Sequence, residues 1–149
     1  MERAEFEQLV EDGYLLLPEW VQKKISNVAI LVEDEPSDEV RRVEDLGPDE
    51  TLLGYYQGIP LTERGELYGV GVTMPDTITI YRLPILEAAS DSLSLDEDAR
   101  VTNSNIEAYR EAVRKEVADT IWHEFAHHFG MDEHEVRSRE EKRESRDLV

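Results

Sequence analysis

The residues best suited to chemistry lie together in the stretch HEFAHHFG, residues 123–130. His123 and His127 are four positions apart, which on a helix places both imidazoles on one face, one turn apart. Histidine nitrogen is a common zinc ligand, so the pair can bind one Zn²⁺ ion. Glu124 lies about 100° around the helix from His123, where its carboxylate can face a water on the metal. The spacing therefore predicts a zinc site for one ion, with Glu124 as the catalytic general base.

The alternative explanation is an ordinary helix end that happens to be rich in histidine. A chain of 149 residues shows the five-residue His-Glu-x-x-His pattern by chance at roughly the per-cent level or below. The surroundings also favour a site, because Phe125, Ala126 and Phe129 can pack and Gly130 can end the helix. A metal site is the stronger interpretation.

A tetrahedral catalytic zinc needs a third protein ligand and one open position. Gly130 and Glu133 follow His127 at a spacing that resembles the extended zincin pattern, in which a glycine breaks the helix and a ligand follows three residues later. That ligand is familiar as His, or Asp in some relatives, so Glu133 is a departure. We predict Glu133 as the third ligand, with several neighbours left open: Asp132, His134, Glu135, and the downstream Glu140, Glu141 and Glu144.

Two further side chains are candidates for a supporting role. His128 points about 100° away from His127 on a regular helix, so it cannot join the same coordination sphere. We predict a partly buried position beside the ligands, with stabilisation of a transition-state oxyanion as the alternative. Tyr81 and Arg82 end the segment TITIYR and could line the cleft if that strand runs beside the helix; packing or surface pairing is the simpler explanation.

A long helix over residues 103–129 must position the site. Its apolar residues fall three or four apart, which is the stripe of a helix that packs against a core. Asn103 or Ser104 could cap its start. The stripe consists of Ile106, Tyr109, Val113, Val117, Ile121, Phe125 and Phe129.

The remaining pattern predicts short helices and strands in mixed order. Apolar runs and β-branched residues indicate strands, and a turn at Met74–Asp76 indicates a hairpin between two of them. The predicted helices are 3–12, 17–25, 40–46, 85–90 and an exposed one within 131–149; the predicted strands are 28–32, 51–58 and a hairpin of 70–73 with 77–82; a linker covers 90–104.

Composition limits the class of protein. The length of 149 residues suits one domain, and a formal net charge of -19 repels nucleic acid and anionic membranes. There is no cysteine, which excludes thiolate metal sites and disulfides. The acidic N-terminal residues do not form a secretory signal, and no apolar run is long enough to span a membrane. We expect a cytoplasmic protein with a single domain over residues 1–149, in which residues 132–149 form a C-terminal helix or a partly frayed tail.

The chain also resembles the small bacterial zincin-like metallopeptidases, a family first grouped as a domain of unknown function. The segments GIPLTER and HHFG carry the most specific part of the likeness, which covers nearly the whole chain. The resemblance implies an α+β fold, with a small twisted sheet packed on the motif helix and further helices at both ends. It assigns zinc binding to His123 and His127 and the base role to Glu124, and it implies no defined substrate.

These observations support a zinc metallopeptidase that acts on a peptide or protein substrate through a metal-activated water. The alternative from another class is a metal-binding module that keeps the zincin-like scaffold for binding or regulation and turns over no substrate. An acidic interaction protein without metal is the weakest hypothesis.

Overall fold

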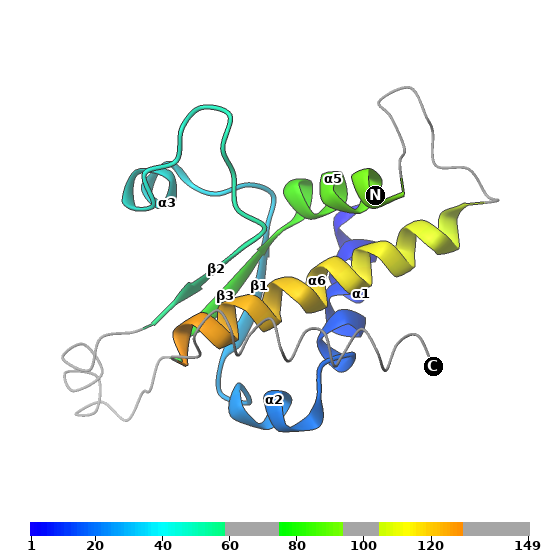
Figure 1. Ribbon diagram of the computed structural model, residues 1–149, viewed down its shortest axis with the longest axis horizontal. Coiled ribbons are helices and arrows are strands. Elements are labelled where there is room, and N and C mark those ends of the chain that lie inside the picture. The colour runs from blue at the N-terminus through cyan, green and yellow to red at the C-terminus, as the bar shows by residue number, and fades with distance from the viewer. Residues whose placement is uncertain (59–74, 94–104, 130–149) are drawn as a thin grey trace.

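The computed structural model describes residues 1–58, 75–93 and 105–129, which form an α+β arrangement (Figure 1). Helices precede and follow a small sheet, and the longest helix comes last among the described elements. In chain order the elements are α1 (Arg3–Leu15), α2 (Glu19–Lys24), β1 (Ala29–Glu33), α3 (Asp38–Val43), β2 (Gly54–Gln57), β3 (Thr77–Tyr81), α5 (Arg82–Ser92) and α6 (Ile106–His128).

The sheet of the described residues has three strands in the order β1-β3-β2. β3 runs parallel to β1, with Ile78 opposite Ile30, and antiparallel to β2, with Ile78 opposite Tyr56. Ile78 and Ile80 are fully buried in the centre of the sheet, which explains why this β-branched segment takes the middle position.

The hairpin prediction is wrong in its pairing. The segment 77–82 does contain a strand, but both edges of that strand are occupied, one by β1 and the other by β2. The expected partner, residues 70–73, lies outside the described residues. The pairing with β1 and β2 satisfies the backbone groups on both edges of β3 and places Ile78 and Ile80 in the core, and a local hairpin pattern does not reveal partners so distant in the chain.

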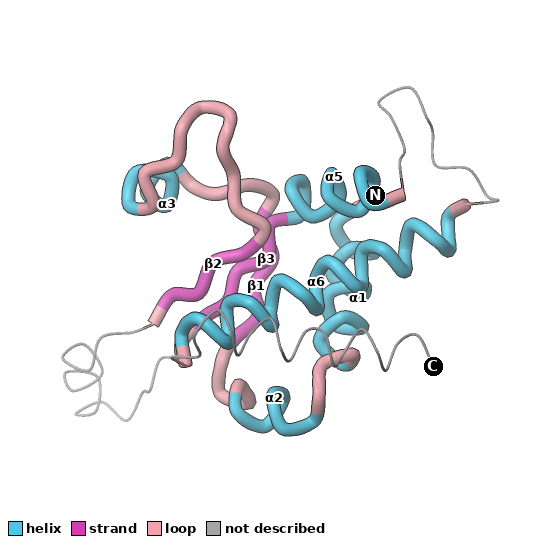
Figure 2. Tube along the Cα trace, in the orientation of Figure 1, coloured by secondary structure: helices cyan, strands magenta, loops and turns pink. Residues whose placement is uncertain are grey.

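The long helix α6 crosses the sheet and contacts α1, α5, β2 and β3 (Figure 2). Most of its predicted apolar stripe is the buried face, since Val113, Val117 and Ile121 have no exposed surface and Phe125 is 2% exposed. The prediction is wrong at the end of the stripe, because Phe129 follows the last turn of α6 and is 46% exposed. The helix begins at Ile106, and Asn105 is its N-cap residue. The proposed caps Asn103 and Ser104 and the terminator Gly130 lie outside the described residues.

Helix α1 lies close against α6. A Cβ atom on Gly13 would lie 2.9 Å from the carbonyl oxygen of Arg114 and 2.9 Å from Val117 Cγ1, so only glycine permits this approach. Phe6, Leu9 and Val10 of α1 are buried in the same core. The close crossing fixes α6 well before the turns that carry the histidines.

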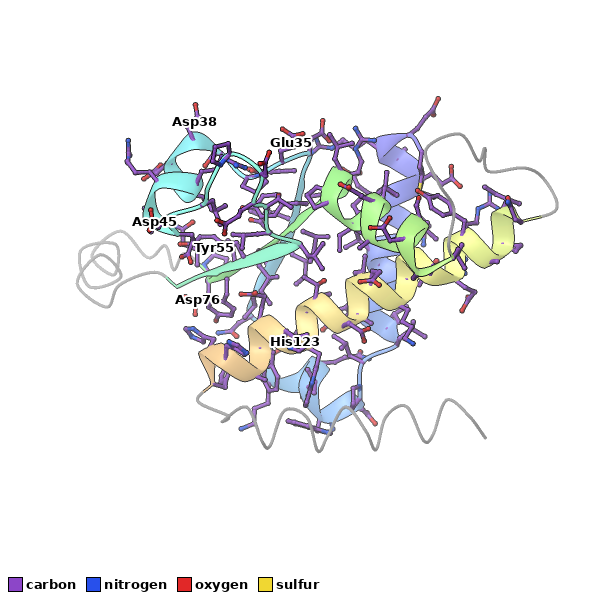
Figure 3. All side chains as sticks on the ribbon, turned by 45° about the horizontal axis from the view of Figure 1, so that its top comes forward. Glu35, Asp38, Asp45, Tyr55, Asp76 and His123 are labelled. Atoms are coloured by element: carbon purple, nitrogen blue, oxygen red, sulfur yellow. The ribbon has the colours of Figure 1, made fainter. Side chains whose placement is uncertain are left out.

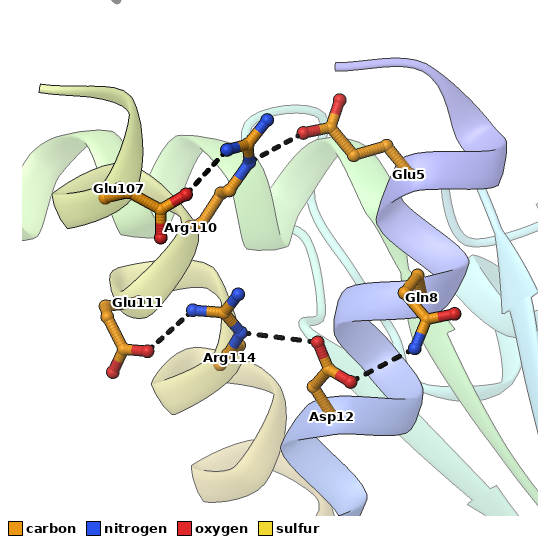
Figure 4. A network of polar contacts seen from close by, with 7 residues as sticks. All are labelled: Glu5, Gln8, Asp12, Glu107, Arg110, Glu111 and Arg114. Carbon is orange, nitrogen blue, oxygen red and sulfur yellow. Dashed lines mark hydrogen bonds and ion pairs between the residues drawn. The ribbon is translucent and has the colours of Figure 1, made fainter. Parts of the chain in front are cut away.

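A row of polar contacts links the outer sides of α1 and α6 (Figure 4). Arg110 Nε donates to Glu5 Oε1 over 3.0 Å, and Arg114 Nε lies 3.4 Å from Asp12 Oδ2. Each arginine also contacts a glutamate one turn earlier on α6, Glu107 or Glu111, at 2.6 Å. These pairs hold the two helices in a defined alignment at the rim of their apolar contact.

The other elements mostly follow the predictions, with shifted ends. α3 begins at Asp38 because Ser37 caps it by accepting a bond from the Val40 amide over 3.2 Å. α5 begins at Arg82 and extends to Ser92, which places the first residues of the predicted linker in a helix. Residues 94–104 of that linker and the C-terminal segment 130–149 lie outside the described residues. Among the described helices, none is long and apolar enough to span a membrane.

Candidate metal centre and its surroundings

The last turns of α6 present two rows of functional side chains. His123 and His127 form one row on the exposed side of the helix, with ring centroids 6.3 Å apart and ring planes at 77°. His123 is labelled on this part of the helix in Figure 3. Glu124 and His128 form the second row, which faces β2 and its flanks. The i, i+4 spacing thus separates candidate ligands from the side chains that contact the sheet.

Glu124 is tied to strand β2. The backbone N–H of Tyr56 donates a hydrogen bond to Glu124 Oε2 over 3.1 Å, between residues 68 positions apart in the chain. In the antiparallel register Tyr56 is opposite Ile78 of β3, so this amide joins the sheet to the helix. The carboxylate is therefore held at one oxygen by a rigid element.

The environment of Glu124 favours its protonated form. Burial raises the pKa of this carboxyl above its ordinary value, against the lowering effects of the Tyr56 amide and of the His127 and His123 charges. A carboxyl group whose pKa is raised in this way is a better proton acceptor than a fully hydrated one. The direction of the shift suits a general base.

His128 is held by a stacking contact. Its ring lies 3.7 Å from the Tyr56 ring, centroid to centroid, at an interplanar angle of 16°. Its Nε2 atom lies 4.0 Å from Asp76 Oδ2, and the same carboxylate oxygen accepts a 2.7 Å bond from the Tyr56 hydroxyl. His128 therefore lies against β2, but 41% of its side chain is exposed, so it is less covered than the sequence predicted. Its role in an oxyanion contact stays a prediction.

Tyr81 lies deep in the protein at the end of β3. Only 1% of its surface is exposed, and burial raises the pKa of its hydroxyl to about 12. The hydroxyl therefore stays protonated at neutral pH, inside the core. A supporting role for Tyr81 in catalysis remains a prediction of the sequence alone.

The donor set of α6 fits zinc in type. Neutral imidazole nitrogen is a preferred zinc ligand, and the exposed rings of His123 and His127 lie on one helix face with their centroids 6.3 Å apart. The described ranges contain no group of three or more His, Asp or Glu side chains placed to hold a metal. The predicted third ligand Glu133 and its alternatives in 132–144 lie outside those ranges, so the ligand assignment at that position stays a prediction.

Comparison with known proteins identifies the class. The model of the zincin-like metallopeptidase family matches residues 25–105 and 102–143, and the second match includes the histidine-rich end of α6. The chain belongs to the zincin-like metallopeptidase family. A comparison with curated proteins finds no match. The family and the α+β class inferred from the sequence are thereby confirmed.

Tyr56 and Asp76 were missed by sequence reasoning. Tyr56 holds Glu124 through its backbone amide, a group that every residue except proline possesses, so no residue type could have indicated it. Asp76 was assigned to a turn, whereas its carboxylate accepts from the Tyr56 hydroxyl just before β3 begins (Asp76 is labelled in Figure 3). The paired tyrosines of segment 51–58 were the available signal, since a tyrosine in a half-buried strand usually bonds through its hydroxyl.

Proposed function

We propose that this protein is a zinc-dependent peptidase that hydrolyses peptide bonds, with Glu124 as the general base. The observation that carries the proposal is the placement of Glu124: its carboxylate is held by the Tyr56 amide over 3.1 Å, directly beside the His123 and His127 pair. Membership of the zincin-like metallopeptidase family supports the same chemistry.

The residues of the proposed site have two roles, metal binding and proton transfer. His123 and His127 would hold the ion, together with a third ligand for which Glu133 is our proposal. Zinc, when bound, supplies Lewis-acid activation of a water molecule and of the scissile carbonyl. Glu124 Oε2 is held by the sheet, so Oε1 is the oxygen that takes the water proton and later delivers it to the leaving amine.

We propose that the substrate lies along β2. β2 is an outer strand of the described sheet, and the Tyr56 N–H points away from β3 towards Glu124. An extended peptide that lies along this edge of β2, with the Tyr56 N–H left to Glu124, would pass in front of the carboxylate. The net charge of -19 favours neutral or cationic peptides over acidic ones.

Zinc content and cleavage of a peptide library test the proposal together. Untagged protein should bind about one equivalent of zinc, and His123→Ala should lose most of that binding. Zinc-loaded wild type should cleave library peptides, read by mass spectrometry, while Glu124→Gln should lose at least about 10²-fold in kcat/KM and keep its zinc. Glu116→Gln, the same change at an earlier position on α6, is the matched control and should cleave like wild type.

Two results would contradict the peptidase. One is equal cleavage by wild type and Glu124→Gln, which would indicate a contaminating protease. The other is a zinc-loaded wild type that cleaves nothing in a broad library. That second result, with zinc bound, would support the alternative of a metal-binding module that acts in binding or regulation.

A further inference from the structure

Tyr56 connects the sheet to the functional end of α6 by several distinct contacts. Its amide donates to Glu124 Oε2 over 3.1 Å, and its ring stacks on His128 with centroids 3.7 Å apart. Its hydroxyl donates to Asp76 Oδ2 over 2.7 Å. One residue of β2 thus contacts the proposed base and the residue that follows the ligand His127.

Asp76 makes this connection rigid. Its carbonyl oxygen accepts from the Ala29 amide over 2.9 Å, which ties the start of β3 to the start of β1. Its carboxylate is largely covered, with 19% of the side chain exposed, and lies 4.0 Å from His128 Nε2 as well as against the Tyr56 hydroxyl. A bond from a neutral hydroxyl to a carboxylate is stronger than one between neutral groups. Asp76 therefore fixes the Tyr56 ring relative to the sheet.

The end of α6 needs such an anchor. The buried stripe of the helix ends near Phe125 and Ala126, while His127, His128 and Phe129 are exposed. The last turn of a helix lacks intrahelical partners for its carbonyl groups and frays readily when little packs against it. In the described residues, the stack of His128 on Tyr56 packs this turn against β2.

We infer that Tyr56 is a positioning residue: anchored by Asp76 and stacked on His128, it holds the last turn of α6 against β2 so that Glu124 keeps a fixed place beside the ligand histidines. The inference rests on the proposed peptidase function for its catalytic consequence. Its structural content, a coupling between the Tyr56 hydroxyl and the position of Glu124, stands apart from that function.

The kinetic test removes the anchor without removing the ring or the amide. Tyr56→Phe should lower kcat by about 5- to 50-fold, because small displacements of a catalytic group are costly, with KM within about twofold and zinc affinity within about threefold of wild type. Asp76→Ala should lower kcat by a similar factor. Asp76→Asn keeps an acceptor oxygen for the Tyr56 hydroxyl and should lower kcat less. Tyr14→Phe is the matched control, since it also removes one hydroxyl bond, to the Gln22 carbonyl at 3.3 Å, far from the site.

The control also separates positioning from general stability. If Tyr56→Phe and Tyr14→Phe lower the melting temperature alike and both keep the kcat of wild type, the inference is overturned. A Tyr56→Phe variant that loses zinc and keeps kcat when zinc is saturating also overturns it, because the hydroxyl would then serve the ligands and not Glu124.

A measurement on metal-free protein decides the inference even if no peptide is cleaved. The carboxyl ¹³C resonance of Glu124, assigned with Glu124→Gln, should be displaced in Tyr56→Phe and in Asp76→Ala, and unchanged in Tyr14→Phe. Tyr56→Leu should in addition remove the ring-current shift of the His128 ring protons. A Glu124 resonance that stays in place in Tyr56→Phe contradicts the positioning role, whereas absence of cleavage by wild type contradicts only the peptidase.

Discussion

Gly54 of β2 lies directly against Thr120 of α6: a Cβ atom on Gly54 would come within 2.5 Å of Thr120 Cγ2 and 3.1 Å of the Thr79 carbonyl oxygen. This contact sets the distance between the helix and the strand that holds Glu124. Gly54→Ala should therefore overpack the interface and lower the free energy of unfolding by about 1–3 kcal/mol. Urea denaturation of both proteins measures the difference.

A second substitution tests the cause of that effect. Thr120→Ser removes Cγ2 and keeps the hydroxyl that donates to the Glu116 carbonyl over 2.7 Å, so the double variant should recover part of the loss. At Gly47 an added Cβ meets only the end of the Glu50 side chain at 2.9 Å, and Gly47→Ala should change stability by less than about 0.5 kcal/mol. Equal effects at both glycines would show that backbone freedom, not the contact with α6, is responsible.

Replacing the proposed base should stabilise the metal-free protein in a pH-dependent way. Burial raises the pKa of the Glu124 carboxyl. The protonated carboxyl is therefore tolerated at low pH, and the free energy of unfolding falls as pH rises through the folded-state pKa and the group ionises. Glu124→Gln should therefore melt higher than wild type at pH 7, and the two should converge below about pH 4. Thermal melts across this range measure the trend.

Asp34 offers a control of opposite sign. The hydrogen bond from Arg82 lowers the pKa of the Asp34 carboxyl, so its contribution is present at neutral pH and is lost as pH falls. Asp34→Asn should melt lower than wild type at pH 7, with the difference shrinking in acid. If Glu124→Gln instead shows the trend of Asp34→Asn, the surroundings of Glu124 stabilise its ionised carboxylate, which contradicts the raised pKa.

Removing the metal should leave the fold in place. The core face of α6, with Val113, Val117 and Ile121 fully buried, is separate from the exposed face that carries His123 and His127. Chelation should abolish cleavage and lower the melting temperature modestly, and added zinc should restore both. Far-UV circular dichroism at 25 °C follows the helix content; its collapse on chelation would mean that the ion is structural.

The ion pair between Arg114 and Asp12 should couple α1 to α6 weakly. The atoms lie 3.4 Å apart, and the side chains are 21% and 33% exposed, so solvent screens much of the attraction. A double-mutant cycle with alanine at both positions should give a coupling of about 0.5–1 kcal/mol that falls in high salt. The more exposed Arg3–Glu7 pair, at 56% and 52%, should give a smaller value and serves as the reference.

The sequence predicted what depends on local pattern. The apolar stripe of α6 and the short apolar run of β1 are periodic signals, and both elements lie close to where they were expected. The likeness of GIPLTER and HHFG to a known family was also sufficient to identify the class.

Relations between distant segments could not be predicted in the same way. The sequence pattern predicted β3 as one arm of a hairpin, yet β3 pairs with β1 along one edge and with β2 along the other. The backbone amide of Tyr56 has no signature in the sequence. It donates to Glu124 because β2 and α6 lie in close contact, as they do at Gly54. The proposed third ligand follows the last described turn, so its assignment still rests on spacing.

The bond between the Tyr56 amide and Glu124 spans 68 positions and joins an outer strand to the last described helix. Loop closure over such a distance is slow and costs entropy, so this contact forms only when the surrounding structure has formed. A chain in which β2 has separated locally from α6 would keep both histidines on one helix face, but its Glu124 carboxylate would no longer be held by the sheet. Under the proposed peptidase function, hydrolysis would then depend on the assembled contact between β2 and α6 as well as on the metal ligands.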